Sequence, residues 1–440
     1  MTNSKVPLLI SLIALLLAVV VQGRDWPQWR GPFLNGSTDE KNLPSSWGRT
    51  ENIVWVRSLP GPGSGTPIIR NGRVFIASAD RQGQDLLALC FDENSGRELW
   101  RRKLGSLKRR YPRNEMASPS PVADEKLVCF TFGSGDMAGL DLEGNILWKR
   151  NIEKEYGNLA FQFGYSSSPL LYKETLYIPV LRRDKPYRPP KSDLPLDSFL
   201  LAIEAKTGKI LWKQPRQTDA YSESMESYIT PIIFDNHGRH EILLTGCDYI
   251  TSHDPETGGE LWRFEYITTR HRDQRLIPSL VTADGLIFGS RHKHGGVFAI
   301  KTLREGKNTR VDYAWNFTGP SPDCGTPLYY DGLLYVLDGI KRGKTLSCLN
   351  PKTAKVLWQG KIGGNAPWRA SLTGADGKLY CINEVSEAIV LKAGRQGFRI
   401  LFRYDFKEKP SRSSIAVANS RLFIRTSKNL YCIGKSKISR

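Results

Sequence analysis

The most regular feature of the chain is a short apolar strand that opens after a small residue and runs into a tight hairpin. Thr66-Pro67 opens one such unit, Ile-Ile-Arg follows, and Asn71-Gly72 turns the chain into Val-Phe-Ile. Asn-Gly and Asp-Gly pairs between apolar runs predict two-residue hairpins, because these residues tolerate positive φ. The pattern therefore predicts eight hairpins, which open near Thr66, Ser120, Ser168, Thr230, Pro278, Thr326, Ser371 and Ser413.

A second pattern is a polar turn followed by a strand that carries a tryptophan. Two clear copies are Asp92-Glu-Asn-Ser-Gly96-Arg-Glu-Leu-Trp100 and Glu204-Ala-Lys-Thr-Gly208-Lys-Ile-Leu-Trp212. A copy at 392–401 lacks the tryptophan, and Trp55 stands in a strand with no such turn before it. We interpret the tryptophans of this pattern as structural; they are Trp55, Trp100, Trp148, Trp212, Trp262, Trp315 and Trp358.

Together the two patterns give four strands per unit, which is one antiparallel blade. A blade cannot bury both faces alone and must stack on its neighbours. The predicted fold class is therefore all-β, an eight-bladed β-propeller of four-stranded antiparallel blades. The strand at 52–56 is expected to close the last blade as its outer strand, beside the strands within 413–433, because closure removes a free sheet edge. Seven blades would follow if the copy at 392–401 were not a blade.

The first residues of the sequence predict export. Lys5 precedes an unbroken apolar run from Val6 to Val21, which is the layout of a secretory signal peptide with cleavage after Gly23. The alternative is an uncleaved anchor, but sixteen apolar residues are fewer than the ~20 that span a bilayer. The expected segments are a signal peptide at 1–23, one secreted or periplasmic propeller domain at 24–440 without a membrane span, a lead-in at 24–51 and a Pro-rich loop insertion at 182–198.

The chain is strongly basic, with a formal net charge of +19. Its Lys and Arg residues are scattered along the sequence instead of gathered in one stretch, so we do not expect a nucleic-acid partner. A basic surface attracts acidic polymers. The expected partners are an envelope protein or an acidic polysaccharide or lipid, and the protein is expected to be a monomer.

The seven cysteines are mostly explained as packing residues. Cys90, Cys348 and Cys432 align with glycine, alanine and serine in other repeats, where cysteine serves as a small hydrophobe. Only Cys247 and Cys324 fall outside such repeat positions, and their pairing stays open. No cluster of residues has the spacing of a metal site, so none is predicted.

Candidate ligand-binding residues lie in the loops that join each outer strand to the next inner strand. These loops converge on the channel of a propeller, and here they are rich in charged and aromatic residues. Such groups suit an anionic, flat or sugar-like ligand; alternatively, they seal the channel by pairing with one another. The candidates are Arg113, Glu115, Glu226, Arg272, Arg275, Asp323, Trp368 and Arg369.

The turn-and-tryptophan repeat resembles the PQQ-type β-propeller repeat, in which an acidic residue, Thr-Gly and Trp follow in order. The segment Asp25-Trp-Pro-Gln-Trp-Arg-Gly-Pro32 is similar to the opening of secreted PQQ-like propellers of planctomycete-type bacteria. The resemblance covers nearly the whole mature chain. It implies that the repeat tryptophans wedge between blades and that the Thr-Gly turns rim the propeller.

The resemblance leaves three functions open. The first is a non-catalytic binding or scaffold propeller of the cell envelope, similar to outer-membrane assembly factors; this is our main expectation, with no catalytic residue and no cofactor. The second is a PQQ-dependent dehydrogenase, for which the resemblance implies calcium, adjacent disulfide-bonded cysteines, a tryptophan floor and a catalytic aspartate. The chain has no Cys-Cys pair; Trp368, Arg113 and Asp323 would have to serve as floor, quinone clamp and base. The third is a carbohydrate- or polyanion-binding propeller.

Overall fold

The computed structural model describes residues 25–49, 51–107, 109–111, 113–187, 193–306, 308–341 and 343–435. The expected signal peptide lies outside the described residues, as does the middle of the expected loop insertion.

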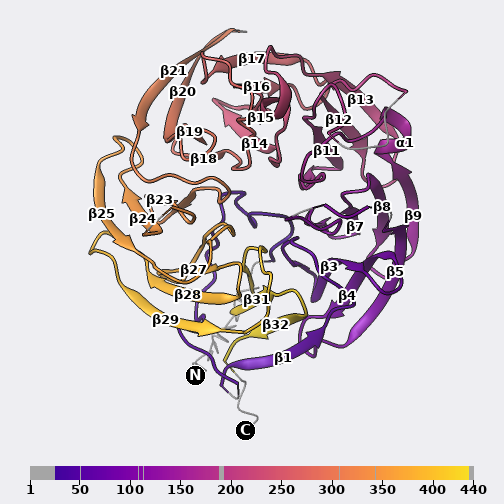
Figure 1. The fold of residues 1–440 in the computed structure, drawn as a ribbon, viewed down its shortest axis with the longest axis vertical. Coiled ribbons are helices and arrows are strands. Elements are labelled where there is room, and N and C mark those ends of the chain that lie inside the picture. Colours follow the sequence, from indigo (N-terminus) through magenta and orange to yellow (C-terminus); the bar gives the residue numbers. More distant parts are fainter. Residues whose placement is uncertain are drawn as a thin grey trace, which may run out of the picture.

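The chain forms eight four-stranded antiparallel sheets arranged as blades around one axis (Figure 1). Blades 1 to 4 consist of β2 (Ile68–Arg70), β3 (Arg73–Asp80), β4 (Asp85–Asp92) and β5 (Glu98–Ser106); β6 (Val122–Ala123), β7 (Leu127–Thr131), β8 (Asp136–Asp141) and β9 (Ile146–Asn151); β10 (Leu170–Tyr172), β11 (Thr175–Val180), β12 (Phe199–Glu204) and β13 (Ile210–Pro215); and β14 (Ile232–Asn236), β15 (Arg239–Gly246), β16 (Tyr249–His253) and β17 (Glu260–Glu265).

The second half of the ring repeats this order, and its last blade borrows a strand from the start of the chain. Blades 5 to 8 consist of β18 (Val281–Ala283), β19 (Leu286–Ser290), β20 (Val297–Glu305) and β21 (Asn308–Phe317); β22 (Leu328–Tyr330), β23 (Leu333–Leu337), β24 (Thr345–Leu349) and β25 (Val356–Lys361); β26 (Thr373–Ala375), β27 (Lys378–Ile382), β28 (Glu387–Lys392) and β29 (Ile400–Asp405); and β30 (Ala416–Ala418), β31 (Arg421–Arg425), β32 (Asn429–Ile433) and β1 (Ile53–Ser58).

The predicted fold and its closure are confirmed. The degenerate copy at 392–401 does form the last turn of a blade, so the ring has eight blades and not seven. Strand β1 pairs with β32, with Trp55 opposite Cys432, and completes blade 8 as its outer strand. Figure 1 shows indigo β1 beside yellow β32, where the early and late parts of the chain meet.

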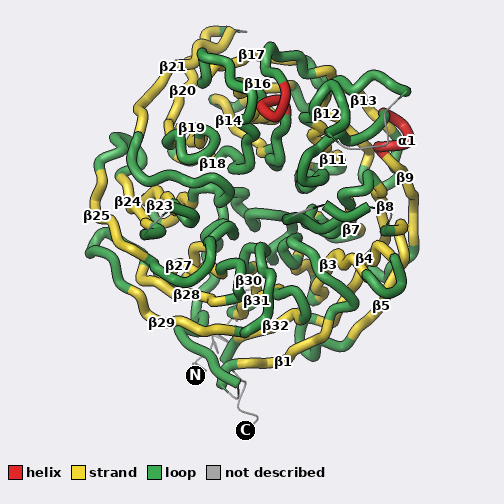
Figure 2. The backbone as a smooth tube through the Cα atoms, in the orientation of Figure 1, coloured by secondary structure: helices red, strands yellow, loops and turns green. Residues whose placement is uncertain are grey.

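Helices contribute almost nothing to the described part of the molecule. Figure 2 shows two short turns, α1 (Ile152–Tyr156) and the 3-10 helix η1 (Ser222–Met225), between strands and many loops. Neither has the length or the apolar character to cross a membrane.

Each repeat tryptophan lies on the outer strand opposite the small residue that the sequence alignment identified. Trp100 pairs with Cys90 across β4 and β5, next to a bulge. Its indole N–H donates to the carbonyl oxygen of Leu142 in the next blade, at 2.9 Å. The ring also covers Gly144 so closely that a Cβ there would lie 2.7 Å from it. The tryptophan thus joins one blade to the turn of the next, and Trp55, Trp148, Trp212, Trp315 and Trp358 donate to turn carbonyls in the same way.

Trp262 differs, because in the next blade the two outer strands continue past the point at which the other blades turn. Blade 5 joins β20 to β21 by a longer hairpin. The Trp262 indole donates instead to Glu241 Oε2 within its own blade, at 2.7 Å. Glu241 is fully buried, and it also accepts from Asn236 Nδ2 and Ser252 Oγ. A buried carboxylate therefore takes the place of the missing turn carbonyl.

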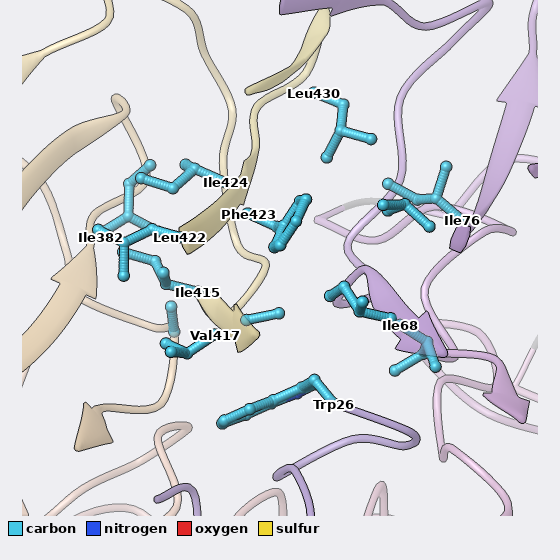
Figure 3. Packing of buried hydrophobic residues seen from close by; sticks show 14 of the residues in the cluster. Trp26, Ile68, Ile76, Ile382, Ile415, Val417, Leu422, Phe423, Ile424 and Leu430 are labelled. Atoms are coloured by element: carbon cyan, nitrogen blue, oxygen red, sulfur yellow. The ribbon is translucent and has the colours of Figure 1, made fainter. Parts of the chain in front are cut away.

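The lead-in is an ordered part of the propeller and crosses the centre of the ring (Figure 1). Trp26 exchanges backbone hydrogen bonds with Ile69 of blade 1, and Ser37 bridges to Gly374 of blade 7. Between them, the buried Arg30 guanidinium donates to the carbonyl oxygens of Leu372 and Pro327. Figure 3 shows the Trp26 ring as a plate below the gap between the core residues of blades 8 and 1. The lead-in therefore closes one end of the channel.

Candidate functional site

The wall of the channel is built from two residues per blade. The innermost strand of each blade begins at an equivalent position. The residues two and four places before that first residue point toward the axis. They share a side because side chains alternate along an extended chain. We name the first set the hydroxyl ring, because all its members are Ser or Thr: Thr66, Ser120, Ser168, Thr230, Ser279, Thr326, Ser371 and Ser414. The second set is the variable ring: Ser64, Ser118, Ser166, Tyr228, Ile277, Cys324, Arg369 and Arg412.

The hydroxyl ring joins neighbouring blades through backbone amides. The N–H of Thr66 donates to Ser120 Oγ, and the N–H of Ser120 donates to Ser168 Oγ, both at 2.9 Å. In the same way the N–H groups of Thr230, Ser279 and Thr326 donate to the next hydroxyl, which joins blades 4 to 7. A buried N–H needs an acceptor, which explains why each strand opens with a small hydroxyl residue.

The variable ring is asymmetric. Blades 1 to 3 contribute only serines, while blades 4 to 8 contribute Tyr228, Ile277, Cys324, Arg369 and Arg412. All eight members line a cavity of about 200 Å³ together with six members of the hydroxyl ring. The remaining lining residues come from the connecting loops and from the lead-in: Trp29, Arg113, Asn114, Phe163, Arg275 and Ala370.

Trp29 closes the inner end of the cavity. The lead-in pairs with residues Ile69 and Gly374, each of which lies three residues after a member of the hydroxyl ring. At roughly 3.3 Å per residue, the lead-in therefore crosses the channel about 10 Å beyond the hydroxyl ring. Trp29 is half-buried, and it is the lead-in residue that lines the cavity. The cavity is therefore open toward the loops and floored by an indole.

Around the mouth, acidic and basic side chains alternate in an ion-pair arc. It runs from Glu223 to Arg275 at 3.1 Å, to Asp323 at 3.5 Å, to Arg369 at 3.9 Å, to Glu384 at 3.0 Å and to Arg412 at 2.6 Å. The arginines of this arc line the cavity and its three carboxylates do not. Although burial opposes the charge, Asp323 and Glu223 raise the pKa of Arg275 above its usual value. The carboxylates thus hold Arg275 charged and keep the arginines of the arc in place.

Behind the wall, Glu226 anchors a second group. It is fully buried, accepts from Tyr228 Oη at 2.5 Å and pairs with Arg183. Burial raises the pKa of Glu226, with Tyr228 and Arg183 opposing the rise. Burial also raises the pKa of the Tyr228 phenol well above its usual value. Tyr228 therefore remains protonated and keeps its ring at the cavity wall.

The structure brings some of the sequence-predicted candidates together and separates others. Arg113, Arg275 and Arg369 line the cavity, and Asp323 stands directly behind two of them. These loops pair with one another through ion pairs and still leave a cavity between them.

The other candidates lie away from the cavity. Trp368 is 1% exposed, belongs to the hydrophobic core and donates its indole N–H to Gly363 O at 2.8 Å. Arg272 is exposed and does not line the cavity. Glu115 pairs with Arg81 at 2.5 Å, and Glu226 acts through Tyr228.

Sequence reasoning missed the floor, two aromatic wall residues and one arginine. Arg412 was detectable, because it stands at the same distance before its innermost strand as Arg369. Phe163 and Tyr228 lie in loops that the pattern had already marked. Trp29 lies in the lead-in, which has no repeat with which to align, so nothing in the sequence placed it at the axis.

All seven cysteines are unpaired. Cys247 lies at 3.0 Å from the carbonyl oxygen of Met225, while Cys324 contacts Arg369 and Asp323. The open question of a bond between Cys247 and Cys324 is therefore answered in the negative. Burial raises the pKa of Cys324 to about 12, so its thiol stays protonated in the cavity wall.

The architecture and the repeat have a counterpart among known families. A PQQ-type family model, described as outer membrane protein assembly factor BamB, matches residues 38–179 and 246–393, which is more than half of the chain. The chain belongs to this PQQ-like family. The resemblance expected from the turn-and-tryptophan repeat is thereby confirmed. A search of curated proteins finds no match.

Solved structures of this PQQ-like fold include an alcohol dehydrogenase and a BamB protein. The quinohemoprotein alcohol dehydrogenase of Comamonas testosteroni has a TM-score of 0.66 and 11% identity, over 94% of this chain and 82% of that one. BamB from Moraxella catarrhalis has a TM-score of 0.59 and 13% identity, over 88% of this chain and 98% of that one. At such identities the likeness extends to the fold alone.

Proposed function

We propose that this PQQ-like protein is a non-catalytic binding propeller of the cell envelope, and that it binds an anionic ligand in the floored cavity of its channel. The observation that carries the proposal is the composition of the lining, which has four arginines and, among the described residues, no aspartate or glutamate. Arginine presents several N–H donors in a fixed fork and binds carboxylates and phosphates in pairs of hydrogen bonds. The family description and the predicted export signal support an envelope location.

Two of the arginines carry N–H groups that find no acceptor among the described residues, a buried one on Arg275 and exposed ones on Arg113. Arg275 Nε has no acceptor within the described part of the chain. Arg113 is exposed and has no ion-pair partner among the residues that the structure describes. An arginine already oriented by carboxylates loses little conformational freedom when a ligand arrives, which favours binding.

The dehydrogenase alternative lacks the groups that it needs in this cavity. Calcium prefers several carboxylate or carbonyl oxygens, and the described residues contain no group of three or more His, Cys, Asp or Glu that would hold a metal. Asp323 is engaged by Arg275 and Arg369, and Trp368 packs in the core. The cavity of about 200 Å³ is also smaller than the pockets of roughly 300 to 1,000 Å³ that hold drug-sized ligands, which disfavours a tricyclic quinone.

Calorimetric titration with citrate, a small polycarboxylate probe, tests the anion site. We expect binding to the wild type without calcium, and at least about tenfold weaker binding to a variant with both Arg275→Gln and Arg369→Gln, because two charge-assisted contacts are lost. Arg369→Lys keeps the positive charge but loses the planar fork of N–H donors, so its affinity for citrate shows how much the geometry of the arginine contributes. Arg101→Gln is the matched control, since Arg101 pairs with Glu98 on outer strand β5, and it should bind like the wild type.

The same titration with PQQ decides the alternative. Calcium-dependent micromolar binding of PQQ, with dye-linked dehydrogenase activity, would replace this proposal by the enzyme. If no heat were observed with citrate in folded wild-type protein, the anion-binding function would be wrong. Thermal unfolding of each variant ensures that a lost signal reflects the site and not the fold.

A further inference from the structure

Resting on the proposed anion site, we infer that the ligand is a hexuronate, a single sugar ring that carries one carboxylate, either free or at the end of an acidic glycan. Three parts of the cavity recognise three parts of such a molecule. These are the indole floor, the hydroxyl ring and the arginines at the mouth.

The size of the cavity selects a single ring. The cavity volume of about 200 Å³ lies below the roughly 300 to 1,000 Å³ of pockets that hold drug-sized ligands. The large residues of the variable ring stand on blades 4 to 8, and the three serines of blades 1 to 3 leave the free space on their side. A monosaccharide unit is of the right order for this space.

The floor suits the carbon face of a sugar ring. Trp29 lines the cavity, and the guanidinium of its buried neighbour Arg30 lies 5.8 Å from the centre of the Trp29 ring. An indole face carries partial negative charge, so it attracts the polarised C–H bonds of a pyranose ring. Phe163, whose ring lies 5.2 Å from the Arg275 guanidinium, adds a second aromatic surface to the wall.

The hydroxyl ring suits the oxygen atoms of the sugar. Ser120, Ser168 and Ser371 each accept a bond from a backbone N–H, and within the described part of the protein none of them donates one. Their O–H groups are therefore available to sugar oxygens inside the cavity. A ligand without hydroxyl or ring oxygens would leave these donors buried without partners, which is costly.

The arginines at the mouth suit the carboxylate. Arg275 and Arg369 lie in the wall with their charges fixed by the ion-pair arc, and Arg113 stands exposed at the entrance. A carboxylate on the sugar can take paired hydrogen bonds from one of these groups. Further acidic units would leave the cavity past Arg113, and the net charge of +19 over the whole chain favours a polyanion as the partner.

Calorimetry with galacturonate, galactose and trigalacturonate tests the inference on the wild type and on variants of the floor. We expect galacturonate to bind at least about tenfold more tightly than galactose, which lacks the carboxylate. Trp29→Leu should lower the affinity for galacturonate at least about fivefold. Trp29→Phe keeps an aromatic face, so its affinity should stay within about threefold of that of the wild type. Arg101→Gln again serves as the control.

Each outcome has a distinct meaning. Equal binding of galactose and galacturonate, or a Trp29→Leu variant that binds normally, would overturn the inference. If citrate binds and galacturonate does not, the hexuronate inference is wrong but the proposed anion site remains supported. If neither citrate nor galacturonate binds, the inference and the proposed anion site are both wrong. Tighter binding of trigalacturonate than of galacturonate assigns the site to a glycan end, and equal binding assigns it to the free sugar acid.

Discussion

At the scale of single residues, the propeller depends on side chains that supply hydrogen bonds where the backbone does not. Trp262 shows this most clearly, because its usual partner, a turn carbonyl of the next blade, is absent and Glu241 serves instead. The indole, Ser252 Oγ and Asn236 Nδ2 all donate to this one carboxylate. Removal of a buried acceptor leaves its donors unsatisfied, which costs more than the net value of the bonds.

Replacement of Glu241 should therefore destabilise the protein strongly. We expect Glu241→Ala to lower the free energy of unfolding by about 3 kcal/mol or more, because it leaves buried polar groups and Arg239 without their partner. Glu241→Gln should cost less, since it keeps an acceptor. Urea unfolding followed by tryptophan fluorescence measures both. The control is Glu260→Ala, in an exposed pair with Arg263, which should stay within about 0.5 kcal/mol; an equally small effect for Glu241→Ala would contradict the role given to Glu241.

His253 makes the free energy of unfolding depend on pH. Its ring is buried against Gly258 O and Thr251 Oγ1, and burial lowers its pKa to about 4 from 6.5. The unfolded chain therefore binds a proton at this histidine more readily than the folded protein does. The folded protein has its full stability from neutral His253 above pH 6.5, and this contribution to the free energy of unfolding is lost as the pH falls through 4. At about 1.4 kcal/mol per pKa unit, the loss approaches about 3 kcal/mol.

A comparison of variants isolates this histidine. The pKa of Asp248 is raised by burial to about 6, and this group acts in the opposite direction because its folded form prefers the proton. We therefore expect His253→Gln to flatten the wild-type decline in unfolding free energy between pH 6.5 and pH 4, leaving the contribution of Asp248 unchanged. Parallel declines in both proteins would show that His253 is not the titrating group.

At the scale of elements, the repeat explains what the sequence predicts and what it does not. Strand openings, hairpins and turn-tryptophan pairs recur, so the blades and their closure are predictable from their spacing. The site is predictable only where it follows the same register. Arg369 faces the channel and Trp368 does not, because adjacent residues of an extended chain point in opposite directions. The contribution of Trp29 comes from a segment without repeats, and its position depends on tertiary contacts.

The lead-in should behave as a separately anchored element. The buried Arg30 guanidinium donates to three carbonyl oxygens, those of Leu372, Asn35 and Pro327. We expect Arg30→Met to increase hydrogen exchange at the amides of Ile69 and Gly374, which donate to the lead-in, without loss of the folded ring, since β1 still closes blade 8. Lys41→Met, an exposed change in the same segment, is the control. Unchanged protection in Arg30→Met would mean that this arginine does not anchor the lead-in.

At the scale of the whole molecule, one ring of eight blades combines a uniform frame with a single asymmetric feature. The hydroxyl ring repeats in every blade and joins neighbours, while the variable ring places serines on one side and arginines on the other. The ion-pair arc spans the loops of blades 4 to 8 and holds those arginines toward the axis. The lead-in then blocks the far end, so the channel becomes a cavity with one entrance.

The most direct test of this account is a crystal structure of the protein grown with citrate. We predict ligand density in the cavity above Trp29, with carboxylate oxygens within hydrogen-bonding distance of Arg275 or Arg369 and no metal ion between them. An empty cavity at saturating citrate, or citrate bound only on the outer surface, would contradict the claim that the channel is the binding site.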